Sequence, residues 1–150
     1  KLDTIRDQLI FWKAGAQPAQ LLASGEVALT SVYNGRLDSA NRNDGKHFGM
    51  VWAGSLYTID SWVILKGSPN VDPAYKLLTF LGAPENQKQL PEYIAYGVTA
   101  KAATKLIDPK RLPDLPTAPE NLAQSVEISD TFWLENLEKL TERFNKWTAR

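Results

Sequence analysis

The spacing of apolar and polar residues predicts short helices interleaved with short strands. Helical spacing or helix-capping signals occur over 4–13, 19–23, 74–81, 84–90, 100–107 and 130–147, and 36–43 is a helix or a loop. Runs of β-branched and aromatic residues typical of strands occupy 26–33, 48–52 and 57–65. This alternation predicts an α/β fold with a mostly parallel sheet. Three strands are few for a sheet covered on both faces, so the pattern indicates a piece of a larger α/β protein, with some apolar surface left without its partner.

The C-terminal third carries two further patterns. Residues 108–124 contain four prolines and predict an extended connector. Ser129 and Asp130 can cap a last helix, whose apolar stripe has alternating spacings of four and three residues. The stripe consists of Trp133, Leu137, Leu140, Phe144 and Trp147. Core packing is the more frequent role of such a stripe, and docking of a partner is the alternative.

Composition and charge exclude several classes of function. The chain has 17 Lys and Arg against 17 Asp and Glu, without a basic run, so we expect no nucleic-acid partner. It has no cysteine, which excludes disulfides, thiolate catalysis and cysteine-based zinc sites. No apolar run approaches the ~20 residues that cross a bilayer. The start at Lys1, without a signal-peptide pattern, is what a mature, secreted or truncated product would look like.

The residues give no positive support for catalysis. His47 is the only histidine, and no nucleophile-elbow glycines surround it. Neither a dinucleotide-binding nor a Walker pattern occurs. Residues 41–45 resemble a calcium loop, but in the register set by Gly45 the ligand positions include Ala40 and Arg42. We therefore expect a protein that is not an enzyme and that holds no cofactor or metal.

The segment 57–65 carries the most informative side chain, because Asp60 interrupts a predicted buried strand. A buried carboxylate is costly unless a partner compensates it. Asp60 either accepts hydrogen bonds from backbone amides at a bend, or faces a cleft and pairs with a cation. Since side chains alternate between the faces of a strand, Thr58 and Trp62 share a face with Asp60. Aromatic residues near this and other strand ends favour an organic cation, which a ring and a carboxylate can bind together.

Five motifs in order resemble the bacterial solute-binding proteins, and most of all the periplasmic spermidine/putrescine-binding proteins of ABC importers. They are Ser24-Gly25-Glu26-Val27-Ala28, Tyr33-Asn34-Gly35-Arg36, Ile59-Asp60-Ser61-Trp62-Val63-Ile64 with Lys66-Gly67, 115–121 and 140–145. The resemblance spans essentially the whole chain but only about the C-terminal half of such a protein. No single motif is decisive, and the order of the five makes the resemblance specific.

The resemblance implies the C-terminal part of a two-lobed periplasmic binding protein fold of type II. On this basis residues 1–56 belong to the second lobe, residues 57–98 return to the first lobe, and residues 99–150 bring the Pro-rich connector and the last helix back to the second. The missing N-terminal half of the same protein would build most of the first lobe. Alternation between lobes explains the small number of strands.

The resemblance also implies a ligand site, with two departures. Tyr33 takes the place of the family's cleft aromatic, with Asn34 beside it in the turn, and Asp60 that of the carboxylate that pairs with a ligand amine. Tyr96 matches a further site tyrosine. The family's second aromatic aligns with Thr58, which we keep as a site residue although it has no ring. The family's glutamine aligns with Leu134. Arg36 either meets a ligand carboxylate or makes a surface ion pair.

The implied function is the periplasmic solute-binding component of an ABC importer, with a small solute and the membrane permease as its partners. A polyamine-like cation of the putrescine and spermidine class is the first expectation. The two departures make an amino acid such as 4-aminobutyrate, or another small solute, the alternative. An enzyme on the same scaffold, with Asp60 as a general base, would need an acid or nucleophile partner that the sequence does not offer.

Overall fold

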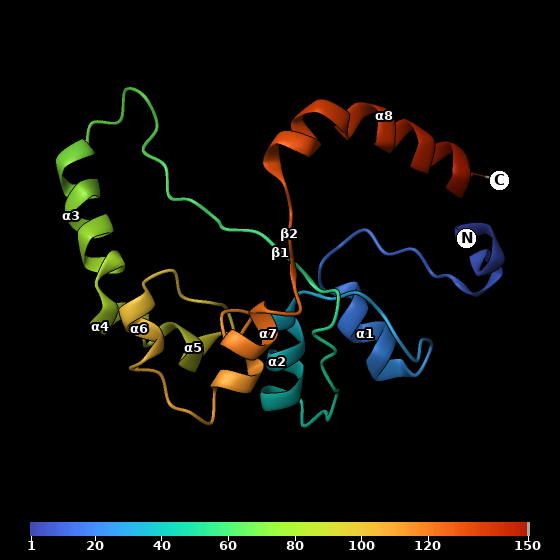
Figure 1. The fold of residues 1–150 in the computed structure, drawn as a ribbon, viewed down its shortest axis with the longest axis horizontal. Helices are drawn as coiled ribbons and strands as arrows, with labels where there is room; N and C mark the ends of the chain where they lie inside the picture. The colour runs from blue at the N-terminus through green and yellow to red at the C-terminus, as the bar shows by residue number, and fades with distance from the viewer. Residues whose placement is uncertain (150) are drawn as a thin grey trace.

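The computed structural model describes residues 1–149, and short helices make up most of its regular structure (Figure 1). The α-helices are α1 (Gln17–Ser24), α2 (Asn34–Asn43), α3 (Val71–Gly82), α4 (Pro84–Gln87), α5 (Leu90–Tyr93), α6 (Lys101–Thr104), α7 (Pro119–Leu122) and α8 (Asp130–Thr148). The 3-10 turns are η1 (Leu2–Thr4), η2 (Arg6–Gln8) and η3 (Leu112–Asp114), and the strands are β1 (Leu56–Tyr57) and β2 (Val126–Glu127).

Local capping signals placed several helices correctly. Helix α1 ends where Gly25 takes the left-handed conformation, with φ of 78°, that glycine adopts without steric cost. Helix α8 begins where the Ser129 hydroxyl accepts a hydrogen bond from the Phe132 amide at 3.2 Å. Helix α3 contains the predicted 74–81 and begins three residues earlier. The positions of these three helices were therefore confirmed, whereas the predicted helices over 84–90 and 100–107 are shorter, with α4 ending at Gln87 and α6 at Thr104.

The predicted strands were mostly wrong. Residues 26–33 and 48–52 are irregular, and the run from 57 to 65 is a strand only at Tyr57. A strand is stabilised by hydrogen bonds to a neighbouring strand. Within residues 1–149 the only ladder is the parallel pair of β1 with β2, so the other candidate strands have no edge to join. Asp60 consequently lies in an exposed extended segment and not in a buried strand.

Two other segments also differ from expectation. Residues 4–13 form 3-10 turns followed by irregular chain in place of an amphipathic helix. The Pro-rich segment 108–124 folds into η3 and α7, and is not an extended connector. It closes over the core, because Leu115 is fully buried. Burial of a leucine side chain contributes about 2 kcal/mol or more, which accounts for the compact path.

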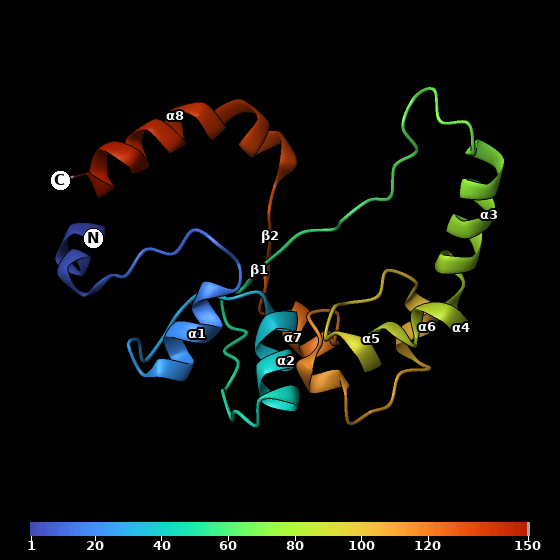
Figure 2. The same cartoon turned by 180° about the vertical axis from the view of Figure 1, so that it is seen from behind.

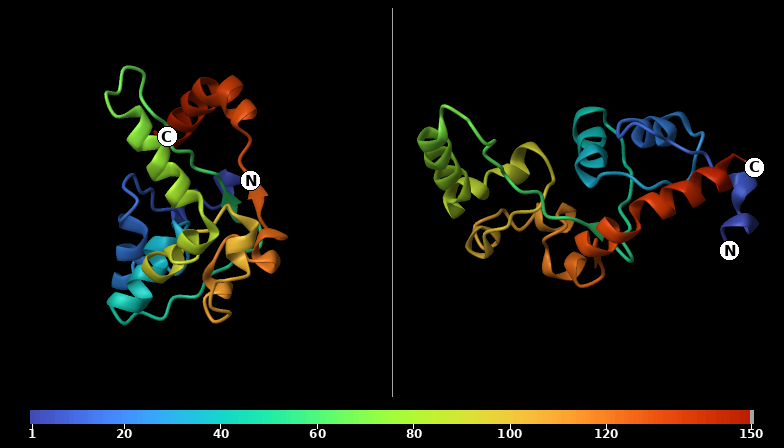
Figure 3. Two further views of the ribbon diagram at one scale, coloured as in Figure 1. Left: turned by 90° about the vertical axis from the view of Figure 1, so that its left-hand side faces the viewer. Right: turned by 90° about the horizontal axis from the view of Figure 1, so that it is seen from above.

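The main buried apolar cluster comes entirely from the segment 95–115. It consists of Ala95, Val98, Ala103, Ile107 and Leu115. Helix α3 lies toward one end of the long axis and α8 reaches toward the other (Figures 2 and 3). The extended segment 58–70 connects β1 to α3, and β2 leads into α8.

The stripe of α8 is packed only at its C-terminal end. Phe11 of the N-terminal segment meets Phe144 and Trp147 edge to face, at centroid distances of 5.9 and 5.6 Å. Trp133 and Leu137, toward the other end of the stripe, are 41% and 55% exposed and make no aromatic contact with another segment of residues 1–149. Internal packing thus accounts for part of the stripe and leaves the rest uncovered.

The surface of the protein is large for its mass. The accessible area is 11763 Å² for 16.7 kDa. About 7,600 Å² is expected for a compact monomer of this mass. Part of the excess is apolar: Ile59, Trp62, Val63 and Leu65 are all between 64% and 76% exposed. The expectation of apolar surface without a partner is confirmed. None of the helices in residues 1–149 is both long and apolar enough to span a bilayer.

The β1–β2 pair joins the segment that leads to α3 with the segment that leads to α8. Leu56 pairs with Val126 and Tyr57 with Glu127, and the hydroxyls of Ser55 and Ser125 lie 2.6 Å apart. The Tyr57 hydroxyl also donates to Glu127 Oε2 at 3.2 Å. Loss of hydration, followed by the charge and the hydrogen bond of Glu127, raises the pKa of Tyr57. The contact therefore needs the neutral phenol, and it is lost as pH rises through the raised pKa.

We predict that Glu127→Gln lowers the pKa of Tyr57 toward its ordinary value of about 10, because the neighbouring charge disappears. Titration of tyrosine absorbance, compared with and without Tyr57→Phe, isolates this group among the five tyrosines. The control is Glu138→Gln, which removes an exposed carboxylate of α8. A Tyr57 titration that is the same in all backgrounds would contradict the contact.

Candidate functional site

The predicted ring residues Tyr33 and Tyr96 each lie against a glycine, and Tyr96 lies at the start of α2. Gly35 lets the Tyr96 ring approach this helix, because a Cβ atom there would lie 2.6 Å from Tyr96 Cε1 and 2.7 Å from Ile94 Cγ1. The Tyr33 ring lies against Gly15, where a Cβ atom would be 3.3 Å from Tyr33 Cε2. Tyr33 is 61% exposed and Tyr96 is 39% exposed, so both rings keep surface available to a solute.

Asn34 is engaged with the protein itself. Its side-chain amide donates to the carbonyl of Ala95 and, at 3.4 Å, to that of Asp114. The side-chain nitrogen of Asn34, a predicted ligand-binding residue, therefore already donates to backbone carbonyls. Asn34 holds the start of α2 on the segment before Tyr96.

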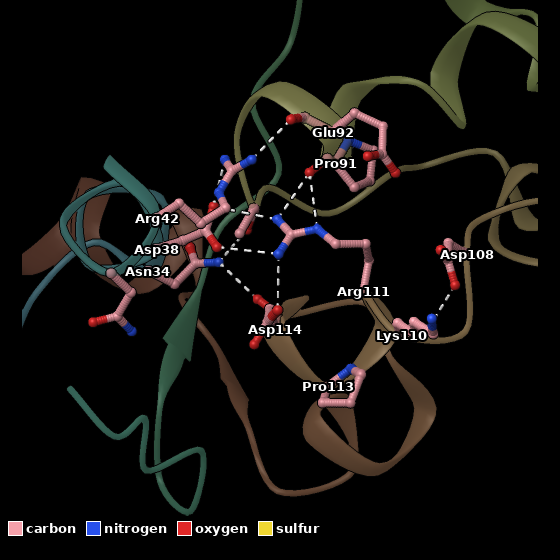
Figure 4. A network of polar contacts seen from close by, with 12 residues as sticks. Asn34, Asp38, Arg42, Pro91, Glu92, Asp108, Lys110, Arg111, Pro113 and Asp114 are labelled. Carbon is pink, nitrogen blue, oxygen red and sulfur yellow. Dashed lines mark hydrogen bonds and ion pairs between the residues drawn. The ribbon is translucent and has the colours of Figure 1, made fainter. Parts of the chain in front are cut away.

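A network of charged side chains continues this contact (Figure 4). The Asp38 carboxylate lies 3.2 Å from Arg111 and 2.7 Å from Arg42. Arg111 also pairs with Asp114 at 2.9 Å and donates to the Pro91 carbonyl at 2.9 Å. The four side chains carry two charges of each sign, so the network is neutral.

Burial makes this network costly to break. The side chains of Asp38 and Arg111 are only 8% and 16% exposed. Burial alone would lower the pKa of Arg111, but the hydrogen bonds and charge of Asp38, followed by the charges of Asp114 and Glu92, raise it. Removal of Asp38 or Arg111 would leave its buried partner with an uncompensated charge, which typically costs about 3 kcal/mol or more.

Sequence reasoning missed Asp38, Arg42 and Arg111. The spacing of Asp38 and Arg42 by four residues was a readable signal for an ion pair on one face of a helix. Arg111 lies 73 residues from Asp38 in the chain, and no local sequence pattern predicts that contact. We call Asn34, Asp38 and Arg42 the docking face of α2, since they lie on one side of the helix and all contact the segments 91–95 or 111–114 directly.

Thr58 and Asp60 stand apart from this group. Both are exposed, and the Thr58 hydroxyl donates to Asp60 Oδ1 at 3.4 Å. No Lys or Arg of residues 1–149 pairs with the Asp60 carboxylate. The backbone-amide alternative for Asp60 finds no hydrogen bond in that part of the chain either. The Asp60 carboxylate is therefore exposed and has no ion-pair partner within residues 1–149.

Arg36 lies on the exposed side of α2, two residues beyond Asn34. It forms no ion pair within the described part of the chain, where a surface ion pair was the alternative to a ligand contact. Its guanidinium is thus open to a carboxylate from outside this segment.

The structure brings Asn34 and the start of α2 against residues 94–96, and no hydrogen bond or ion pair within residues 1–149 joins Tyr33, Asn34 or Tyr96 to Thr58 or Asp60. Two open hollows lie elsewhere, one along residues 63–69 with Ala74 and one between α4 and α6. Nor does any group of three His, Asp or Glu side chains within residues 1–149 come close enough to hold a metal ion. The chemistry that this arrangement supports is non-covalent binding by rings, a carboxylate and a guanidinium.

Comparison with known proteins gives consistent results. The family of bacterial extracellular solute-binding proteins matches residues 1–117. The chain is 41% identical over 151 residues to the gamma-aminobutyric acid-binding protein of Pseudomonas aeruginosa, covering 100% of this chain and 42% of that protein. It is 34% identical over 105 residues to the spermidine/putrescine-binding periplasmic protein of Escherichia coli, covering 69% of this chain and 30% of that protein.

Among solved structures, an ABC transporter substrate-binding protein from Bradyrhizobium japonicum superposes with a TM-score of 0.80 at 33% identity. The match covers 88% of this chain and 42% of that one. The chain therefore spans less than half the length of the curated relatives it matches.

Proposed function

Because this chain belongs to the bacterial extracellular solute-binding proteins, we propose that it forms part of a periplasmic protein that binds a small amine-bearing solute and passes it to the membrane permease of an ABC importer. The relatives are binding proteins, and the proposed activity is binding without chemical conversion. The solute, the permease and the periplasmic location are proposals for the whole protein.

One observation carries the proposal: Tyr96 lies against Gly35 in the first turn of α2, two residues after the exposed Tyr33, while the exposed Asp60 has no basic partner in residues 1–149. A tyrosine ring attracts a cation through its quadrupole and covers methylene groups. A carboxylate supplies the charge-assisted hydrogen bonds that an ammonium group needs. Closure of a two-lobed protein on its solute would bring Asp60, in the segment assigned to the first lobe, toward Tyr33 in the second.

Within this class, a solute with an amine at one end and a carboxylate at the other has the best support. Arg36 is exposed without an ion pair in the described chain and lies on the helix that begins beside Tyr33. Thr58 and Leu134 replace an aromatic and an amide that the polyamine site would use. The similarity to a 4-aminobutyrate-binding protein extends over the whole chain. Polyamines are the second candidate, favoured by the similarity to the spermidine/putrescine-binding protein.

The rest of the cleft would come from outside these 150 residues. The apolar side chains exposed along 59–65 are the surface that such a first lobe would cover. The division into residues 1–56, 57–98 and 99–150 remains part of this proposal. The structure does place the segment 91–96 against α2, so any movement of one lobe on the other involves that contact.

We predict that Asp60→Asn weakens binding of 4-aminobutyrate by roughly ten- to hundredfold, because the ammonium loses its charge-assisted partner. The measurement is titration calorimetry on the complete protein. Asp7→Asn, which neutralises an exposed aspartate of η2, is the matched control. Unchanged affinity in Asp60→Asn would remove Asp60 from the site.

We predict that Arg36→Gln weakens binding of 4-aminobutyrate by about tenfold, because Arg36 meets the solute carboxylate, and leaves the affinity for putrescine nearly unchanged. Arg143→Gln, on the exposed face of α8, controls for loss of an arginine. An equal loss for both solutes, or none for 4-aminobutyrate, would argue against the amino acid and leave polyamines as the candidate.

A further inference from the structure

The docking face of α2 holds a short piece of backbone. Arg42 donates from Nη1 to the Glu92 carbonyl at 2.8 Å and from Nη2 to the Tyr93 carbonyl at 3.1 Å. Asn34 lies eight residues before Arg42 on the same helix, and its side chain donates to the Ala95 carbonyl. Arg42 and Asn34 therefore bind the two ends of the segment 92–95 by hydrogen bonds.

Asp38, between them on the helix, acts through the two arginines. Its Oδ2 lies 2.7 Å from Arg42 Nη2 and 3.2 Å from Arg111 Nη2. Arg111 in turn donates to the Pro91 carbonyl from Nε at 3.3 Å and from Nη2 at 2.9 Å. A buried carboxylate thus fixes two guanidinium groups so that their remaining donors face the carbonyls of residues 91–93.

These carbonyls need such donors. Helix α5 has only four residues, so most of its carbonyl groups have no helical partner. The chain is already extended at Ile94, with φ of −151° and ψ of 135°. Local backbone bonds from Ile94 to Leu90 and from Tyr96 to Ile94 do not tie the segment to α2. Side chains from α2 and Arg111 make that connection.

We propose that Arg42, together with Asp38 and Arg111, is a positioning residue of the solute site: it holds residues 91–95 on α2 and so sets where the Tyr96 ring stands relative to Tyr33. The inference rests on the proposed function and deepens it. The contact at Gly35 connects this segment to the site, because the ring of Tyr96 and the side chain of Ile94 lie directly on the first turn of α2. A shift of the segment moves Tyr96 away from that turn.

Arg42 is the right residue to test, since its side chain is 35% exposed and its loss opens no core cavity. In the complete protein, Arg42→Gln should weaken binding of 4-aminobutyrate by roughly three- to tenfold. In a Tyr96→Ala background the same substitution should have almost no further effect, because the residue through which it acts is gone. Arg42→Lys keeps the charge beside Asp38 but lacks the fork that reaches two carbonyls, so it should restore only part of the affinity.

A second readout needs no solute. Hydrogen exchange in the peptide covering residues 92–98 should accelerate in unliganded Arg42→Gln and stay unchanged in Arg143→Gln. Additive effects of Arg42→Gln and Tyr96→Ala on affinity, or unchanged exchange, would overturn the positioning role. If the wild-type protein binds neither 4-aminobutyrate nor putrescine, the proposed solute class fails, and exchange alone decides whether Arg42 holds the segment.

Discussion

The attachment of α2 to the backbone of residues 91–95 is the constraint on which the rest of the structure depends. Asp38 is nearly buried, and a buried carboxylate must be paired. Arg111 and Arg42 pair with it, and both then have donors left over for the carbonyls of a helix too short to satisfy its own. One negative charge therefore organises two segments that are far apart in the sequence.

This attachment also explains how the candidate site is divided. Tyr33, Asn34 and Tyr96 stand on the two segments that the network joins, so their arrangement is already formed in the chain. Thr58 and Asp60 lie on the extended segment beyond β1, where packing within residues 1–149 does not fix them. A carboxylate on a separate segment suits a two-lobed binding protein whose solute bridges the lobes. The large exposed apolar surface along 59–65 points to the same incompleteness.

Elements fixed by neighbouring residues could be predicted from the sequence. The stop of α1 at Gly25 and the cap of α8 at Ser129 are examples, because the hydrogen bonds involved span only a few residues. Strands could not be predicted in this way. The run from 57 to 65 has the composition of a strand, but it forms one only where β2 lies alongside.

The candidate site also contains features that local sequence predicts and contacts that only the tertiary structure determines. Tyr33, Asp60 and Tyr96 follow from motifs alone, and their shared role in a site stays a prediction. The committed amide of Asn34 and the Asp38–Arg111 pair were out of reach, because each depends on a contact more than sixty residues away in the chain. Buried polar contacts of that kind are fixed by tertiary structure and leave no local trace.

The most direct test of the central claim is a crystal structure of the complete protein with 4-aminobutyrate bound. The account predicts the solute against the rings of Tyr33 and Tyr96, with its amine within about 3 Å of the Asp60 carboxylate, and with α2 still attached to residues 91–95. A solute bound away from both tyrosines, or a site in which Asp60 remains in open water, would contradict it.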